Sequence, residues 1–132
     1  MLDSSVWVSL FAQDVHFVKA VEIFARLAQM KSKIIVPVFV YAEVLNVLKR
    51  RNIPLILRIK IENLFMNHNS LKMVYPSKNF WKIKIHKNIN RTHLKTLDLL
   101  ILTFALEKSV DYFYSFDKNL DIAYRNLTHD DD

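Results

Sequence analysis

The segment KSKIIVPVFVYAEVLNVLKRR (31–51) decides the fold class, because a predicted strand in it runs directly into a predicted helix. The β-branched run near its start is typical of a short strand, and Pro37 suits a position at or just before a helix start. The helical pattern that follows ends in cations, which stabilise a helix C-terminus. A strand that leads into a helix is the building unit of α/β proteins.

Helices and strands alternate along the rest of the chain as well. Apolar residues at helical spacing predict a helix at 16–30, and Pro54 opens another at 54–69. The segment 77–90 fits either element, since WKIKIHK alternates like a strand whereas Ser77 and Asn79 could cap a helix. The alternation predicts one α/β domain with a mainly parallel central sheet. The other predicted elements are a strand stub before Asp3, a helix after it, a buried strand at 71–76, a helix at 94–107, an aromatic strand at 111–116 and a short helix from 118.

The composition excludes several classes of protein. A chain of 132 residues with 52% hydrophobic and 24% charged residues fits one folded domain. The absence of cysteine excludes disulfides, thiolate zinc sites and cysteine nucleophiles, and the absence of glycine excludes glycine-rich phosphate loops. The net charge of +6 favours an anionic partner, with nucleic acid preferred to a membrane. With neither a signal peptide nor a spanning segment in the sequence, we expect a cytoplasmic protein.

The stretch LKTLDLLILTFALE (94–107) places a single carboxylate, Asp98, inside an apolar helix. Residues three and four positions away share a helix face, so the neighbours of Asp98 are Leu94, Ile101 and Leu102. An ionised carboxylate in such surroundings is costly unless it is paired, hydrogen-bonded or bound to a metal, or unless it takes up a proton. We therefore expect a partner for Asp98 outside its own helix.

Three other acids occupy positions that an α/β topology brings to the same edge. Asp3 and Asp117 follow the first and last predicted strands, and ligand sites in α/β sheets lie beyond the carboxyl ends of strands. Glu43, like Asp98, lies in the first or second turn of a helix, with Asn46 one turn away as a possible hydrogen-bond donor. Four separated carboxylates could therefore converge on one spot.

The order of these acids and the apolar residues around them resemble the PIN-domain ribonucleases. Within this family, the sequence most resembles the VapC-type toxins of bacterial and archaeal toxin–antitoxin pairs. The resemblance extends to about residue 125. Here only Met1 and Leu2 precede the first acid, and Thr96-Leu97 stand where the family often has a glycine. The stretches that carry the resemblance are Asp3-x-Ser5, VPVFVYAEVLNVLKR, LKTLDLLILTFALE and YSFDKNL.

The resemblance implies a three-layer α/β/α domain over residues 1–125, followed by a short acidic tail at 126–132. It further implies that clustered acids bind Mg²⁺ or Mn²⁺ and hydrolyse RNA phosphodiester bonds, and both ions prefer carboxylate and water oxygens. A homodimer and a small antitoxin protein are the implied partners. The family's acidic positions correspond to Asp3, Glu43, Asp98 and Asp117, with Ser5 and Ser115 as supporting hydroxyls and Asp121 as a possible accessory acid.

Simpler interpretations stand beside these. Asp3 and Asp117 could merely cap helices, and Glu43 could pair with a cation such as Arg50. The basic and aromatic segment 78–95 either follows an RNA backbone or forms a solvated face. At the level of function, the alternatives to a toxin are a PIN nuclease in housekeeping RNA processing and a non-catalytic binding module that retains the fold.

Overall fold

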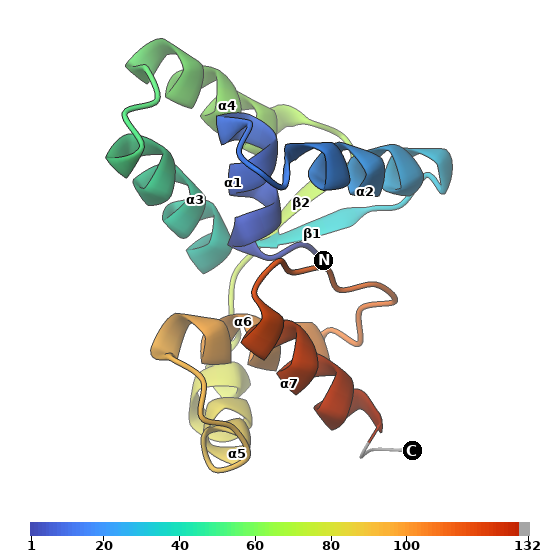
Figure 1. Ribbon diagram of the computed structural model, residues 1–132. Helices are drawn as coiled ribbons and strands as arrows, with labels where there is room; N and C mark the ends of the chain where they lie inside the picture. The colour runs from blue at the N-terminus through green and yellow to red at the C-terminus, as the bar shows by residue number, and fades with distance from the viewer. Residues whose placement is uncertain (130–132) are drawn as a thin grey trace.

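The strand-to-helix unit at 31–51 is formed as expected in the computed structural model, which describes residues 1–129 (Figure 1). Strand β1 (Ile34–Pro37) passes directly into helix α3 (Val38–Arg50), with Pro37 as the extended residue before the helix. The α/β class is therefore confirmed. The other elements are α1 (Ser4–Ala12), α2 (Phe17–Gln29), α4 (Leu55–Asn67), β2 (Leu71–Val74), the π-helical turn η1 (Phe80–Lys84), α5 (Ile85–Ile89), α6 (Thr96–Glu107) and α7 (Lys118–His129).

The parallel ladder is short. Strands β1 and β2 pair in register from Ile34 with Leu71 to Pro37 with Val74, and α3 and α4 form the crossover between them. Within the described residues β2 has no second ladder partner, so it is an edge strand. Its side chains are half-buried or exposed, which corrects the buried strand predicted at 71–76.

The aromatic strand predicted at 111–116 is also wrong in extent. Among residues 1–129, its only pairing is a parallel bridge between Tyr114 and Leu2, supported by hydrogen bonds from the Asp3 N–H to the Tyr114 carbonyl (2.9 Å) and from the Tyr114 N–H to the Met1 carbonyl (3.2 Å). On the C-terminal side of Leu2 the pairing cannot continue, because the chain enters α1 at Ser4. The strand stub predicted before Asp3 is thus reduced to one bridge.

Helices cover both sides of the strands. In Figure 1, α1 to α4 lie on one side of β1, and α5, α6 and α7 lie on the other, which gives the expected three layers. The ambiguous segment 77–90 is helical: the Ser77 hydroxyl accepts a hydrogen bond from the Phe80 N–H (3.2 Å), and Phe80 is fully buried against Phe39 and Phe104. The strand-like alternation of WKIKIHK was therefore overridden by the burial of Phe80.

Helix α6 carries the centre of the core on its side of the strands. Ile101, Leu102 and Phe104 are fully buried, and α6 contacts both α5 and α7. Leu127 is also buried, and α7 continues to His129, so the first part of the expected acidic tail is helical, whereas Asp130–Asp132 lie outside the described residues. Across residues 1–129, none of the helices has both the length and the apolar character to span a bilayer.

Replacing Phe104 with alanine should lower the free energy of unfolding by about 3–5 kcal/mol, because a fully buried ring is lost and a cavity remains. Urea denaturation followed by circular dichroism measures the change. The control is Ile56→Ala on α4, whose side chain is 65% exposed and whose loss should change stability by less than about 1 kcal/mol. Equal losses in the two variants would contradict the assignment of the core.

Candidate active site

Asp3 is buried, with 3% of its surface exposed, and its carboxylate is surrounded by donors. Its Oδ1 accepts hydrogen bonds from the Ser4 N–H (2.7 Å) and the Ser4 hydroxyl (3.2 Å). Its Oδ2 accepts from the Ser5 N–H (3.4 Å), the Ser5 hydroxyl (2.7 Å) and the Ser115 hydroxyl (2.9 Å). Asp3 therefore caps α1, as the simpler interpretation proposed, while its carboxylate is held in one orientation.

Asp117 caps α7 in a similar way. Its Oδ1 accepts hydrogen bonds from the N–H groups of Asn119 (2.8 Å) and Leu120 (3.1 Å). The Asp117 N–H donates to the Ser115 hydroxyl (3.0 Å), and that hydroxyl in turn donates to Asp3. This chain of contacts fixes the position of Asp117 relative to Asp3.

The two helix-borne acids have a different environment. Burial raises the pKa of Glu43, and the charges of Asp3 and Asp98 raise it further, against the opposing effects of the Ser4 hydroxyl and Arg50. Burial likewise raises the pKa of Asp98, followed by the charges of Asp117 and Asp3, with Lys95 acting in the opposite direction. Each of these carboxylates is therefore influenced by at least two others.

All four acids line one open pocket of about 370 Å³. Asp98 lies in the first turn of α6, where the helix dipole favours a negative charge, but within residues 1–129 its carboxylate accepts no hydrogen bond and forms no ion pair. Two of the charges that act on Asp98 are other carboxylates, Asp117 and Asp3, and Lys95 offsets them only in part, since the pKa of Asp98 is raised on balance. A half-buried acid in this environment is suited to a cation supplied from solution.

The donor set fits a hard divalent cation that keeps part of its water shell. Over residues 1–129, no three Asp, Glu or His side chains are grouped as direct ligands of a single ion. Mg²⁺ typically uses one or two carboxylates together with water and substrate oxygens, so it does not need such a closed cage. The acids that line the pocket are Asp3, Glu43, Asp98, Asp117 and Asp14.

Two predicted supporting residues lie elsewhere. Asn46 is exposed one turn further along α3 from Glu43 and does not line the pocket, so it is not placed as a donor to that acid. Asp121 lies one turn into α7, where it forms an ion pair with Arg125 (2.9 Å) outside the pocket. Ser5 and Ser115, in contrast, contact Asp3 directly.

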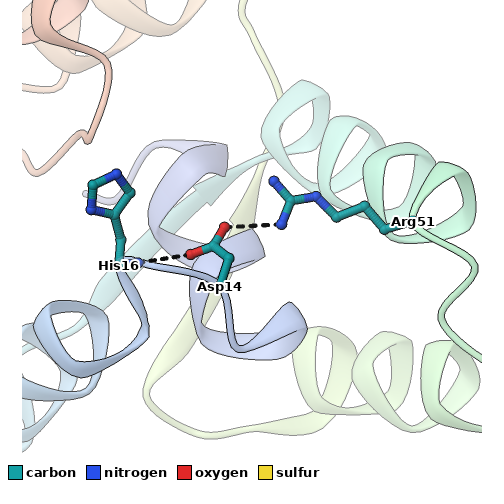
Figure 2. A network of polar contacts seen from close by, with 3 residues as sticks. All are labelled: Asp14, His16 and Arg51. Atoms are coloured by element: carbon teal, nitrogen blue, oxygen red, sulfur yellow. Dashed lines mark hydrogen bonds and ion pairs between the residues drawn. The ribbon is translucent and has the colours of Figure 1, made fainter.

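Several pocket residues were missed by the sequence analysis. Ser4, next to Asp3, binds that carboxylate through both its N–H and its hydroxyl, and its position at a helix start was an available signal. Figure 2 shows Arg51, which reaches from the end of α3 to Asp14 (Nη1 to Oδ2, 2.9 Å), while the His16 N–H donates to the other oxygen of Asp14 (3.0 Å). All three line the pocket, so Arg51 places a cation at its rim.

Comparison with known proteins identifies the family. The sequence profile of the PIN domain matches residues 1–126. The chain belongs to the PIN domain family. This PIN domain is similar to the crystal structure of Mycobacterium tuberculosis VapC20, titled a sarcin–ricin loop cleaving toxin, with a TM-score of 0.72 and 17% identity over 92% of each chain. No significant match is found among curated proteins. The expected PIN fold is confirmed.

Repulsion inside the pocket should make the stability of the PIN domain depend on pH. The pKa of Asp98 in the folded protein is raised above its ordinary value of 3.8. The folded state therefore favours the protonated side chain, and the stability that this provides is present below pH 3.8 and is lost as the pH rises through the folded-state pKa and the carboxylate ionises. In EDTA, Asp98→Asn should therefore become more stable than the wild type as the pH is raised from about 4 to about 7. Urea denaturation over this range measures the difference.

The control is Asp14→Asn in the same pocket. Burial favours the neutral form of Asp14, but hydrogen bonds from His16, Arg51 and Ser9 outweigh it and lower the pKa on balance. The stability that Asp14 contributes is present above its ordinary pKa and is lost as the pH falls. Asp14→Asn should therefore be less stable than the wild type near pH 7. A pH-independent difference for Asp98→Asn would contradict the proposed repulsion.

Proposed function

We propose that the chain is a metal-dependent endoribonuclease that hydrolyses RNA phosphodiester bonds, and that it is the toxin of a toxin–antitoxin pair. The observation that carries the proposal is the set of four carboxylates lining one open pocket in a protein of net charge +6. Membership of the PIN domain family and the likeness in fold to a sarcin–ricin loop cleaving toxin support it.

Asp3, Glu43, Asp98 and Asp117 would hold Mg²⁺ or Mn²⁺. A bound ion of this kind supplies polarisation of a phosphoryl oxygen and a water molecule of lowered pKa. Five donors hold the Asp3 carboxylate in one orientation. Its proposed role is to fix where the ion binds. The exposed edge of the pocket leaves room for substrate oxygens.

The protein's own residues also account for proton transfer and substrate approach. Burial raises the pKa of Glu43, which makes its carboxylate a stronger base for taking the proton of the attacking water. The new bond joins the water oxygen to phosphorus, and the bond from phosphorus to the leaving ribose oxygen breaks. Arg51 at the rim, with a side chain 45% exposed, is placed to attract the anionic backbone.

The proposed partners follow from the same family. A small antitoxin protein would restrain the nuclease by covering the acidic pocket, and a homodimer is the proposed assembly. We place the protein in the cytoplasm, where its RNA substrate lies, in accordance with the lack of a membrane-spanning helix over residues 1–129.

Purified protein should cleave a labelled pool of mixed RNA in Mg²⁺ or Mn²⁺ and not in EDTA. Asp98→Asn should reduce the rate at least about 100-fold, because a pocket carboxylate that supports several kcal/mol of transition-state stabilisation is lost. The matched control is Asp121→Asn, which removes an acid that lies outside the pocket and is paired with Arg125. Mapping of the fragment ends would identify the target.

The outcomes separate the possible functions. Failure of folded, antitoxin-free protein to cleave under any of these conditions would overturn the nuclease assignment in favour of a binding module. Expression in a bacterial host should arrest growth with the wild type and not with Asp98→Asn. Cleavage without growth arrest would contradict the toxin assignment and indicate a housekeeping nuclease.

A further inference from the structure

A second groove, of about 560 Å³, lies next to the acidic pocket. Asp98 and Asp117 line both cavities, so the two share a border at these acids. The groove extends away from the acids between the loop that precedes α6 and one face of α7. A polymer lying across the pocket would therefore pass along this groove.

The two walls of the groove differ in chemistry. The loop wall contains Arg91, His93 and Lys95, all of them exposed. The α7 wall contains Asn119, Ile122, Ala123 and Asn126, whose spacing of three, four and seven residues puts them on one helix face. Two amides thus flank an aliphatic surface on which Ile122 is 56% exposed.

This arrangement matches the parts of a nucleotide chain. Cations on one wall suit the phosphates, which recur at every residue of RNA and contribute most of the salt-dependent affinity. Amides can donate to and accept from the edges of bases, and aliphatic side chains pack against sugars and base faces. A duplex keeps its base edges paired, whereas a single strand can turn them toward α7.

We propose that this groove binds single-stranded RNA on one side of the scissile phosphate, with Lys95 contacting a phosphate and Asn126 contacting a base. The proposal rests on the proposed nuclease function and assigns the path of its substrate. Lys95 and Asn126 are positioning residues, because they hold the strand across the acids and do not contact the reacting atoms.

The groove also clarifies the basic and aromatic segment at 78–95. Phe80 is fully buried in the core and is therefore unavailable to stack on a base. Trp81 is half exposed but does not line the groove. Only the last part of the segment, residues 91–95, borders the groove, and there it contributes the charge of Lys95 and the imidazole ring of His93.

Binding can be separated from cleavage with Glu43→Gln as the parent, since Glu43 lines the acidic pocket but not the groove. A fluorescent single-stranded RNA of mixed sequence is titrated with this variant at several salt concentrations. Adding Lys95→Gln should weaken binding about tenfold and reduce the salt slope by about one. Adding Asn126→Ala should weaken binding about fivefold or more and leave the slope unchanged.

The matched control is Lys60→Gln, which removes an exposed cation from α4, a helix that contributes nothing to the groove. Its affinity and salt slope should equal those of the parent. In the active enzyme, Lys95→Gln and Asn126→Ala should raise KM more than they lower kcat, which a merely structural role would not do.

Two results would overturn the groove assignment. One is equal RNA affinity in Lys95→Gln, Asn126→Ala and Lys60→Gln, which is what a groove for a protein segment predicts; the other is no measurable RNA binding by the Glu43→Gln parent. Cleavage of RNA by the wild type tests the nuclease function separately from the groove assignment. If the wild type cleaves RNA and the groove variants behave as the control does, only the groove assignment fails.

Discussion

The hydrogen bonds that converge on Asp3 are the interaction on which the rest of the structure depends. The N-terminal stub and the segment at 114–117 share only one bridge, from Leu2 to Tyr114, so the ladder contributes little to holding them together. Side chains provide the remaining connections. Ser115 donates to Asp3, and the Ser5 hydroxyl accepts from the Phe116 N–H at 3.0 Å. Each such bond stabilises by about 1 kcal/mol, and more when its acceptor is charged.

The same contacts build the site and join the two ends of the chain. Asp3 caps α1, and Asp117 caps α7, so each carboxylate binds a helix start and also lines the pocket. The capping and site interpretations are therefore compatible. Loss of Asp3 would damage the fold together with the site, whereas the Asp98 side chain accepts no hydrogen bond from the part of the chain that the structure describes, so its replacement should leave the fold intact.

Much of the site follows from the sequence because its determinants are local. The apolar frame around Asp98 showed that no partner existed in its own helix, and the strand-end positions of Asp3 and Asp117 indicated a common edge. Asn46 and Asp121, named as possible supporting residues, do not line the pocket, because spacing alone does not say which way a helix face points. Arg51 could not be foreseen, since its contact with Asp14 spans 37 residues. The strand predicted at 111–116 was too long for a related reason, because pairing with Tyr114 cannot continue past the start of α1 at Ser4.

We propose that the four carboxylates are held together to receive a divalent cation. Their mutual repulsion is a local cost in an otherwise basic protein, and natural proteins retain such costs mainly at functional sites. The most direct measurement is anomalous scattering from crystals soaked in Mn²⁺. We expect a peak in the pocket lined by Asp3, Glu43, Asp98 and Asp117. Ordered carboxylates with no peak between them, at Mn²⁺ concentrations that support RNA cleavage, would contradict it.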